Sequence, residues 1–202
     1  NQWYERDIDS IMERTKNRPI PSKKIDPSEA LTFGIILSFM SIIILGLAVN
    51  WFSSLLLAIT IIFYAVIYTV LLKRSTIQNI VIGGASGAFP PVIGYSLIDG
   101  NISLESLLLF GIIFLWTPPH FWALALLRQK EYKLANIPML PVVHGEKTTR
   151  KYILYYVLLL LPFSMLPFAL GYSSLIYIIT SVILGLEFLR RTHALIKAKN
   201  NS

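Results

Sequence analysis

The chain contains no cysteine, and only 14% of its residues are charged. The lack of cysteine excludes disulfide bonds and thiolate metal sites. The scarcity of charge is unlike a soluble domain, since 54% of the residues are hydrophobic and the mean hydropathy is +0.62. We therefore expect an all-α, polytopic transmembrane helical bundle, because helices satisfy their own backbone hydrogen bonds in lipid.

Six apolar segments recur along the chain, separated by short polar stretches. A helix of about 20 residues crosses the roughly 30 Å hydrocarbon core of a bilayer. We expect a single transmembrane domain over residues 1–202, with spans at about 31–49, 55–72, 79–97, 104–127, 152–170 and 175–188.

The basic residues are distributed unevenly between the two predicted membrane faces. All 18 Lys and Arg fall on one side, and the opposite loops, at 50–54, 96–103 and 171–174, have none. This bias predicts that the basic side is cytoplasmic. The net charge of +7 is then a topology signal, and we do not expect nucleic-acid binding.

An acidic ladder opens the chain. In a helix, Asn1, Glu5 and Asp9 would stack on one face at i, i+4 and i+8. These oxygen donors suit a hard cation such as Mg²⁺ bridging a polyphosphate. Arg14, Lys16 and Arg18 follow, and we expect the helix to end at the proline after Arg18. The simpler interpretation is a solvated helix end with local ion pairs.

Two further polar groups lie on the same predicted face. Lys73 and Arg74 end the second span, as snorkelling anchors or as diphosphate clamps. A cluster of Arg128, Lys130, Glu131 and Tyr132 follows the fourth span. Glu131 could complete a second metal or phosphate site there, or form an i,i+3 ion pair with Arg128.

The fourth span is expected to be interrupted at Trp116-Thr-Pro118-Pro119-His120. An intramembrane histidine is costly and is a functional candidate, although hydrogen-bonded packing is the simpler role. If the helix continued, His120 and Glu131 would share a face. The stiff segment 137–141 is predicted to be a lid or a re-entrant plug.

These motifs together resemble the UbiA superfamily of intramembrane prenyltransferases, and within it the branch that farnesylates heme b. The similarity runs from Asn1 to about Thr149, and several unusual motifs keep their order. The motifs are Asn1-x3-Glu5-x3-Asp9-x2-Met-x-Arg14-Thr-x2-Arg18-Pro, Tyr68-Thr-x3-Lys73-Arg-x-Thr76, Gly83-Gly-x2-Gly-Ala-x-Pro-Pro-x2-Gly94, Leu115-Trp-Thr-Pro-Pro-His-Phe-Trp122 and Ile137-Pro-Met-Leu-Pro141.

The resemblance implies a nine-span bundle, farnesyl diphosphate and heme b as substrates, and Mg²⁺ as cofactor. The products would be heme o, for heme-copper oxidase biogenesis, and diphosphate. Heme A synthase or the terminal oxidase assembly would be protein partners. No signal peptide precedes the first motif and the chain opens with Asn, so we expect an inactive fragment that lacks the first two spans and the last.

The resemblance also assigns roles to residues. Metal ligands would be Asn1, Glu5, Asp9 and Glu131, and catalysis would fall to these four with Lys73. Diphosphate ligands would be Arg14, Arg18, Lys73, Arg74, Arg128 and Lys130. Heme contacts would be His120, Trp116, Trp122 and Tyr132. The second motif departs from the superfamily pattern, because Glu131 stands alone where paired aspartates are common.

Three alternatives stay open from the sequence. A related prenyltransferase could act on an aromatic quinone precursor. A transporter would place polar residues near the bilayer centre, whereas here they gather at one face. A non-catalytic assembly protein would tolerate loss of Asp9.

Overall fold

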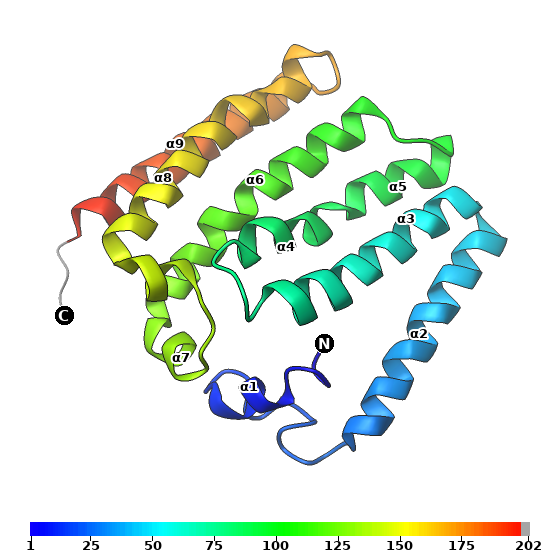
Figure 1. Ribbon diagram of the computed structural model, residues 1–202. Coiled ribbons are helices and arrows are strands. Elements are labelled where there is room, and N and C mark those ends of the chain that lie inside the picture. Colours follow the sequence, from blue (N-terminus) through cyan, green and yellow to red (C-terminus); the bar gives the residue numbers. More distant parts are fainter. Residues whose placement is uncertain (199–202) are drawn as a thin grey trace.

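The computed structural model describes residues 1–198 and is all-helical there, as predicted. The helices are α1 (Arg6–Ile11), α2 (Pro27–Ala48), α3 (Trp51–Ile62), the π-helix η1 (Phe63–Leu72), α4 (Asn79–Ala88), α5 (Pro90–Asp99), α6 (Leu104–Leu127), α7 (Gln129–Leu134), α8 (Leu140–Ala169) and α9 (Leu175–Lys197). Figure 1 places α1, α7 and the end of α9 at one end of the bundle, and the α2–α3, α5–α6 and α8–α9 connections at the other.

Local signals in the sequence set the helix ends. Asp26 caps α2 by accepting from the Ser28 amide, and Pro27 occupies the first turn, where its missing N–H costs nothing. Asn50 and Ser103 cap α3 and α6 in the same manner. Gly100 ends α5 in the left-handed conformation.

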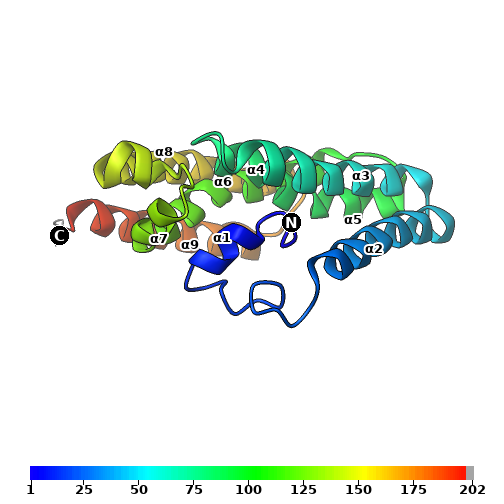
Figure 2. The same cartoon turned by 60° about the horizontal axis from the view of Figure 1, so that its bottom comes forward.

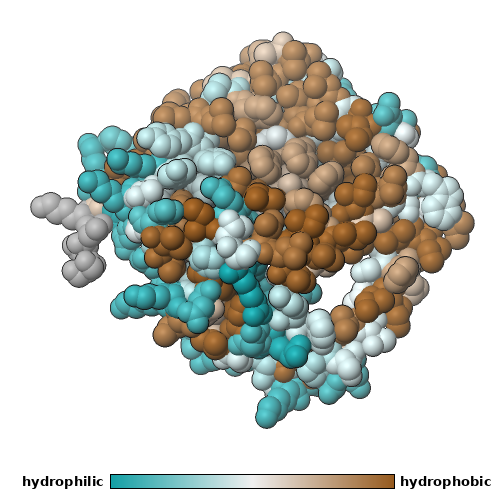
Figure 3. Space-filling model, in the orientation of Figure 1, coloured by the Kyte–Doolittle hydropathy of each residue, from teal (hydrophilic) through white to brown (hydrophobic). Residues whose placement is uncertain are grey.

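Five helical segments are long and apolar enough to cross a membrane: Pro27–Ala48, Trp51–Leu72, Asn79–Asp99, Leu104–Leu127 and Leu140–Ala169. Their outer surfaces are apolar; on α2, for example, Phe33, Phe39 and Leu47 are exposed. Figure 3 shows this apolar surface over the bundle and hydrophilic residues around α1 and the end of α9. Such a surface fits lipid as its solvent.

The sixth predicted span is not confirmed. α9 is a helix packed on α8, but its uncharged stretch runs only from Leu175 to Leu186 before Glu187, Arg190 and Arg191 follow. Twelve residues of helix are about 18 Å long, less than a bilayer core of about 30 Å.

The bundle centres on α6, which packs against α4 on one side and α8 on the other. Gly84 permits the first approach, because a Cβ there would lie 3.0 Å from the Thr117 side chain. α2 packs mainly against α3, and Figure 2 shows the connection between α1 and α2 running along one side of the bundle. This arrangement leaves an internal space between α1, α2 and η1.

Two expectations about the spans need correction. α6 is continuous through Pro118 and Pro119, which are fully buried, so the predicted interruption is absent. The helix stops instead after Leu127, where Arg128 leaves helical geometry, so His120 and Glu131 do not lie on one helix. By contrast, the proline pair that opens α5 does coincide with a break in the helical ladder, at Phe89.

The segment 137–141, predicted to be a lid or a re-entrant plug, is packed in the core, and Ile137 and Met139 also line the large cavity of the bundle. Ile137, Met139 and Leu140 are at most 4% exposed and belong to the main apolar cluster, which also contains Trp122 and Ile153. The prolines here direct the chain from α7 into α8. The core therefore sits at the basic end of the bundle, directly behind α1.

Candidate active site

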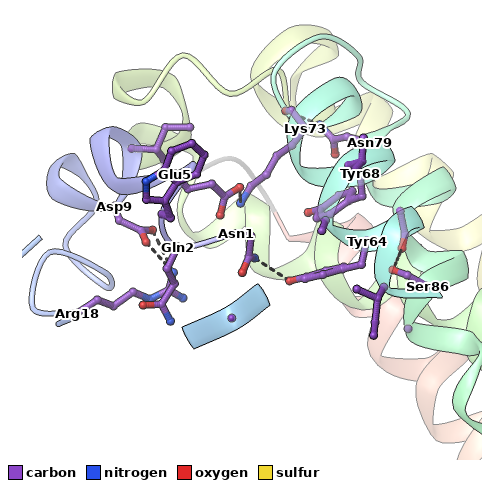
Figure 4. A pocket seen from close by; sticks show the side chains of 18 of the residues that line it. Asn1, Gln2, Glu5, Asp9, Arg18, Tyr64, Tyr68, Lys73, Asn79 and Ser86 are labelled. Carbon is purple, nitrogen blue, oxygen red and sulfur yellow. Dashed lines mark hydrogen bonds and ion pairs between the residues drawn. The ribbon is translucent and has the colours of Figure 1, made fainter. Parts of the chain in front are cut away.

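A cavity of about 1490 Å³ lies between α1, α2, the α3–η1 span, α4 and α6. Its long walls are apolar, with Phe39, Ile61 and Ile113 among the lining residues. Its charged end is formed by α1 and the end of η1, and Figure 4 shows Glu5, Asp9, Arg18 and Lys73 gathered there. The cavity thus offers one charged pole and a long apolar interior.

The acidic ladder has the geometry expected from its spacing. The Glu5 amide donates to the Asn1 carbonyl at 2.9 Å, and the Asp9 amide donates to the Glu5 carbonyl at 2.8 Å. The three side chains therefore follow one another turn by turn, and all three line the cavity. Glu5 and Asp9 are only 2% and 3% exposed.

The predicted helix is shorter than expected. α1 ends at Ile11 because Met12 is extended, and the Thr15 hydroxyl then donates to the Asp9 carbonyl at 3.0 Å, which satisfies a free acceptor at the helix end. The chain folds back on itself, so Arg18 donates to both Asp9 carboxylate oxygens at 3.1 and 2.9 Å. Arg18 reaches the site by this return.

The opposite wall is the π-helix η1. The Lys73 amide donates to the Tyr68 carbonyl, five residues back, at 2.9 Å. In an α-helix, Tyr68 and Lys73 would be about 140° apart around the axis, but the wider π turn brings them closer to one face, and both line the cavity. Tyr64 and Tyr68 stack with ring centroids 5.6 Å apart, and Gly83 leaves room for the Tyr68 ring.

The two walls meet in matched pairs. Across the two walls, the Asn1 side-chain amide donates to the Tyr64 hydroxyl at 3.0 Å, and Glu5 forms an ion pair with Lys73. Asp9 pairs with Arg18, which comes from the segment that follows α1. A buried carboxylate requires such a partner, because an uncompensated charge in a dry site is very costly.

Arg14 lines both the main cavity and a smaller hollow of about 460 Å³. Arg128 and Glu131 also line the hollow, with their nearest charged atoms 3.9 Å apart, which is too far for a hydrogen bond. The Glu131 Oε2 atom is buried and has no hydrogen-bond partner among the described residues. Lys130 is exposed and lines neither space.

Arg74 does not line the cavity. Its guanidinium makes two hydrogen bonds to the Asp7 carboxylate, at 2.8 and 2.7 Å, on the other side of α1. Those bonds hold the pKa of Asp7 below its usual range.

The four predicted heme contacts lie in three different environments. Trp116 and Tyr132 line the cavity. His120 stacks on Trp116, with centroids 4.3 Å apart, but is not among the lining residues. Trp122 is 2% exposed and packs edge-on against Tyr152 and Tyr156 in the core. Burial raises the pKa of Tyr132, so its hydroxyl stays protonated.

Sequence reasoning missed two cavity residues, Tyr64 and Asn79. The spacing of Tyr64 from Tyr68 was the available signal, since residues four apart neighbour one another on a helix. Asn79 is fully buried, its Nδ2 donates to the Lys73 carbonyl at 3.3 Å, and its Oδ1 has no partner within the described chain.

Within residues 1–198, no group of three or more His, Cys, Asp or Glu side chains is close enough to hold a metal ion. Among the oxygen donors that line the cavity, Asn1, Glu5 and Asp9 are an amide and two buried carboxylates one helical turn apart. This oxygen set fits Mg²⁺ in its chemistry.

Comparison with known protein families identifies the family of this chain. The sequence pattern of the UbiA prenyltransferase family matches residues 1–202. The chain belongs to the UbiA prenyltransferase family. No solved structure gives a significant match.

Three curated relatives are named as protoheme IX farnesyltransferases. The chain is 56% identical over 188 residues to protoheme IX farnesyltransferase 2 of Mesorhizobium japonicum, and 55% identical over 188 residues to the protoheme IX farnesyltransferases of Brucella ovis and Brucella anthropi. Each match covers 93% of this chain and 60% of the relative, so the chain spans about 60% of the length of these proteins.

Proposed function

We propose that this protein transfers the farnesyl group of farnesyl diphosphate to a vinyl group of heme b. The products are heme o and diphosphate. The observation that carries the proposal is the cavity, which joins a charged pole at α1 and Lys73 to a long apolar interior. The names of the relatives favour heme b over an aromatic quinone precursor as acceptor.

The volume of the cavity also fits a pair of large substrates. Pockets for one small molecule are usually about 300 to 1,000 Å³. The cavity here is about 1490 Å³, which leaves room for a farnesyl chain and part of a porphyrin together. Heme would contact Trp116 and the His120 ring stacked on it, as well as Tyr132. Trp122 supports this wall from the core.

The charged pole suits a diphosphate leaving group. Asn1, Glu5 and Asp9 would hold Mg²⁺, with Glu131 as a further carboxylate near the smaller hollow, and the bound metal would offset the charge that builds on the leaving oxygens. Lys73 and Arg18, now paired with Glu5 and Asp9, would then turn to the diphosphate. Arg14 lines the same pole and adds a third cation.

The proposed reaction needs no oxidant or reductant. The allylic C–O bond of farnesyl diphosphate breaks, and the diphosphate leaves with the electron pair. The vinyl π electrons form the new C–C bond to the farnesyl carbon. Water then adds to the other vinyl carbon and loses a proton, which gives a hydroxyethylfarnesyl side chain. The apolar walls keep water from the farnesyl cation until that bond has formed.

The basic end of the bundle would face the cytoplasm of a bacterial or archaeal cell membrane, since the Lys and Arg of residues 1–198 fall there. Heme o would pass from this end to heme A synthase or to the assembling terminal oxidase.

Product analysis tests the proposal. Membranes that express the full-length gene encoding this chain are supplied with farnesyl diphosphate, heme b and Mg²⁺, and hemes are extracted for chromatography and mass spectrometry. Farnesylated heme is expected, and it should be lost when Mg²⁺ is chelated and restored on readdition. A prenylated 4-hydroxybenzoate with no farnesylated heme would instead identify a quinone-precursor prenyltransferase.

A further inference from the structure

The acidic helix α1 is too short to be stable alone. It has six residues, and isolated helices below about 12 to 15 residues are marginal in water. The facing of Glu5 and Asp9 into the cavity therefore depends on contacts that α1 makes with other elements. Ile8 and Met12 supply apolar anchors on the core side.

Asp7 supplies a second anchor on the outer side of α1. Its carboxylate accepts hydrogen bonds from both terminal nitrogens of Arg74, a residue 67 positions away just after η1. The same guanidinium donates to the Tyr4 carbonyl at 3.1 Å and lies 4.9 Å from the centre of the Tyr4 ring. Arg74 thus holds both the carboxylate and the backbone of the first turn.

Lys73 and Arg74 engage α1 from opposite sides. Lys73 pairs with Glu5 inside the cavity, whereas the adjacent Arg74 pairs with Asp7 outside it. Neither Asp7 nor Arg74 lines the cavity, so neither is placed to touch a bound diphosphate.

We propose that Arg74 is a positioning residue: with Asp7 it fixes α1 against the end of η1, which keeps Glu5 and Asp9 opposite Lys73, and it does not bind the diphosphate. This inference rests on the proposed function and differs from the diphosphate role that the family resemblance assigns to Arg74. A planar guanidinium suits the task because it grips a carboxylate with two parallel bonds, which an ammonium cannot do.

A double-mutant cycle tests the inference in the full protein in membranes. Asp7→Ala and Arg74→Ala are each expected to lower kcat/KM for heme farnesylation by about 10- to 100-fold, because a small displacement of positioned groups is costly. The double variant is expected to be no worse than the worse single variant, since both remove one contact. Arg74→Lys should resemble Arg74→Ala, and the swap Asp7→Arg with Arg74→Asp should recover part of the activity.

A direct role on the diphosphate gives a different pattern. Arg74→Ala would then weaken inhibition by inorganic diphosphate far more than Asp7→Ala, the two effects would add, and Arg74→Lys would keep most of the activity. That pattern would overturn the inference, and so would unchanged activity in both single variants. The matched control is the surface pair of Glu187 and Arg190 on α9, which is also bidentate at 2.7 and 2.8 Å and whose alanine variants should behave as wild type.

A second measurement reads the position of α1 without turnover. The chain has no cysteine, so a spin label on Ile11→Cys, exposed at the end of α1, reports that helix alone. Asp7→Ala and Arg74→Ala should raise the mobility of the label without lowering the thermal unfolding midpoint of the whole protein. Unchanged mobility would count against the inference even if farnesylation of heme were itself absent, so the two hypotheses can fail separately.

Discussion

Two acidic groups at the same end of the bundle are built in different ways. Glu5 and Asp9 are almost completely buried, and each has its own cation, Lys73 and Arg18. The Glu131 side chain is 28% exposed and lies 3.9 Å from Arg128. A buried, matched pair fixes its members, whereas a loose pair near solvent is worth little. The first group is therefore prepared to exchange its cations for ligands in one geometry, and the second is not.

The largest expected effect comes from neutralising Asp9, a carboxylate that is only 3% exposed. Asp9→Asn leaves Arg18 without its partner and removes a proposed metal donor, so kcat/KM for heme farnesylation should fall by about 100- to 1000-fold, the range seen when one preorganised electrostatic group is removed. Asp99→Asn, an exposed carboxylate at the opposite end of the bundle, is the control and should leave kcat/KM unchanged. Nearly normal turnover in Asp9→Asn would show that the acidic ladder is not needed for the reaction.

Substitutions in the Glu5–Lys73 pair distinguish the role of the Lys73 cation from that of the Glu5 carboxylate. Lys73→Met should weaken inhibition by inorganic diphosphate about 10- to 100-fold, because a charge-assisted hydrogen bond contributes about 1.5 to 3 kcal/mol. Glu5→Gln should not weaken that inhibition when Mg²⁺ is absent, since it releases Lys73. Inhibition constants measured without and with Mg²⁺ check both expectations. Equal weakening in the two variants would mean that Lys73 serves only to neutralise Glu5.

The loosely paired acid should respond less. Glu131→Gln is expected to lower kcat/KM by about 3- to 10-fold, because its carboxylate forms only a loose ion pair with Arg128, at 3.9 Å. Steady-state kinetics with varied Mg²⁺ gives the size of the effect and any change in metal dependence. A decrease in kcat/KM as large as that of Asp9→Asn would show that Glu131 matters as much for turnover as the buried, closely paired carboxylates.

The sequence predicted the helical fold and the facing of the acidic ladder for clear reasons. Apolar runs of membrane length have few alternatives to helix, and spacing of four fixes the face of Asn1, Glu5 and Asp9. The return of Arg18 to Asp9 was not predictable, because it depends on a loop closed by the Thr15 hydroxyl.

The opposite wall of the site was harder to predict. A π-helix has no simple sequence signature, so the alignment of Tyr68 with Lys73 could not be read from α-helical spacing. Trp116 and Trp122 could not be told apart either, because α6 is apolar around its whole circumference and no hydrophobic face marks the core. Only packing shows that Trp116 faces the cavity and Trp122 the core.

The smallest expected effect concerns Tyr132, which is next to Glu131 but lines the main cavity. Burial raises its pKa, so the hydroxyl is neutral through the working pH range and can only act as a hydrogen-bonding group. Tyr132→Phe should therefore reduce kcat/KM by about 2- to 10-fold, the value of one neutral hydrogen bond, equally at each pH from about 7 to 9. A reduction that grows or shrinks across this range would mean that the phenol ionises during turnover. The loosely built side of the site would then hold a titrating group that the closely paired side lacks.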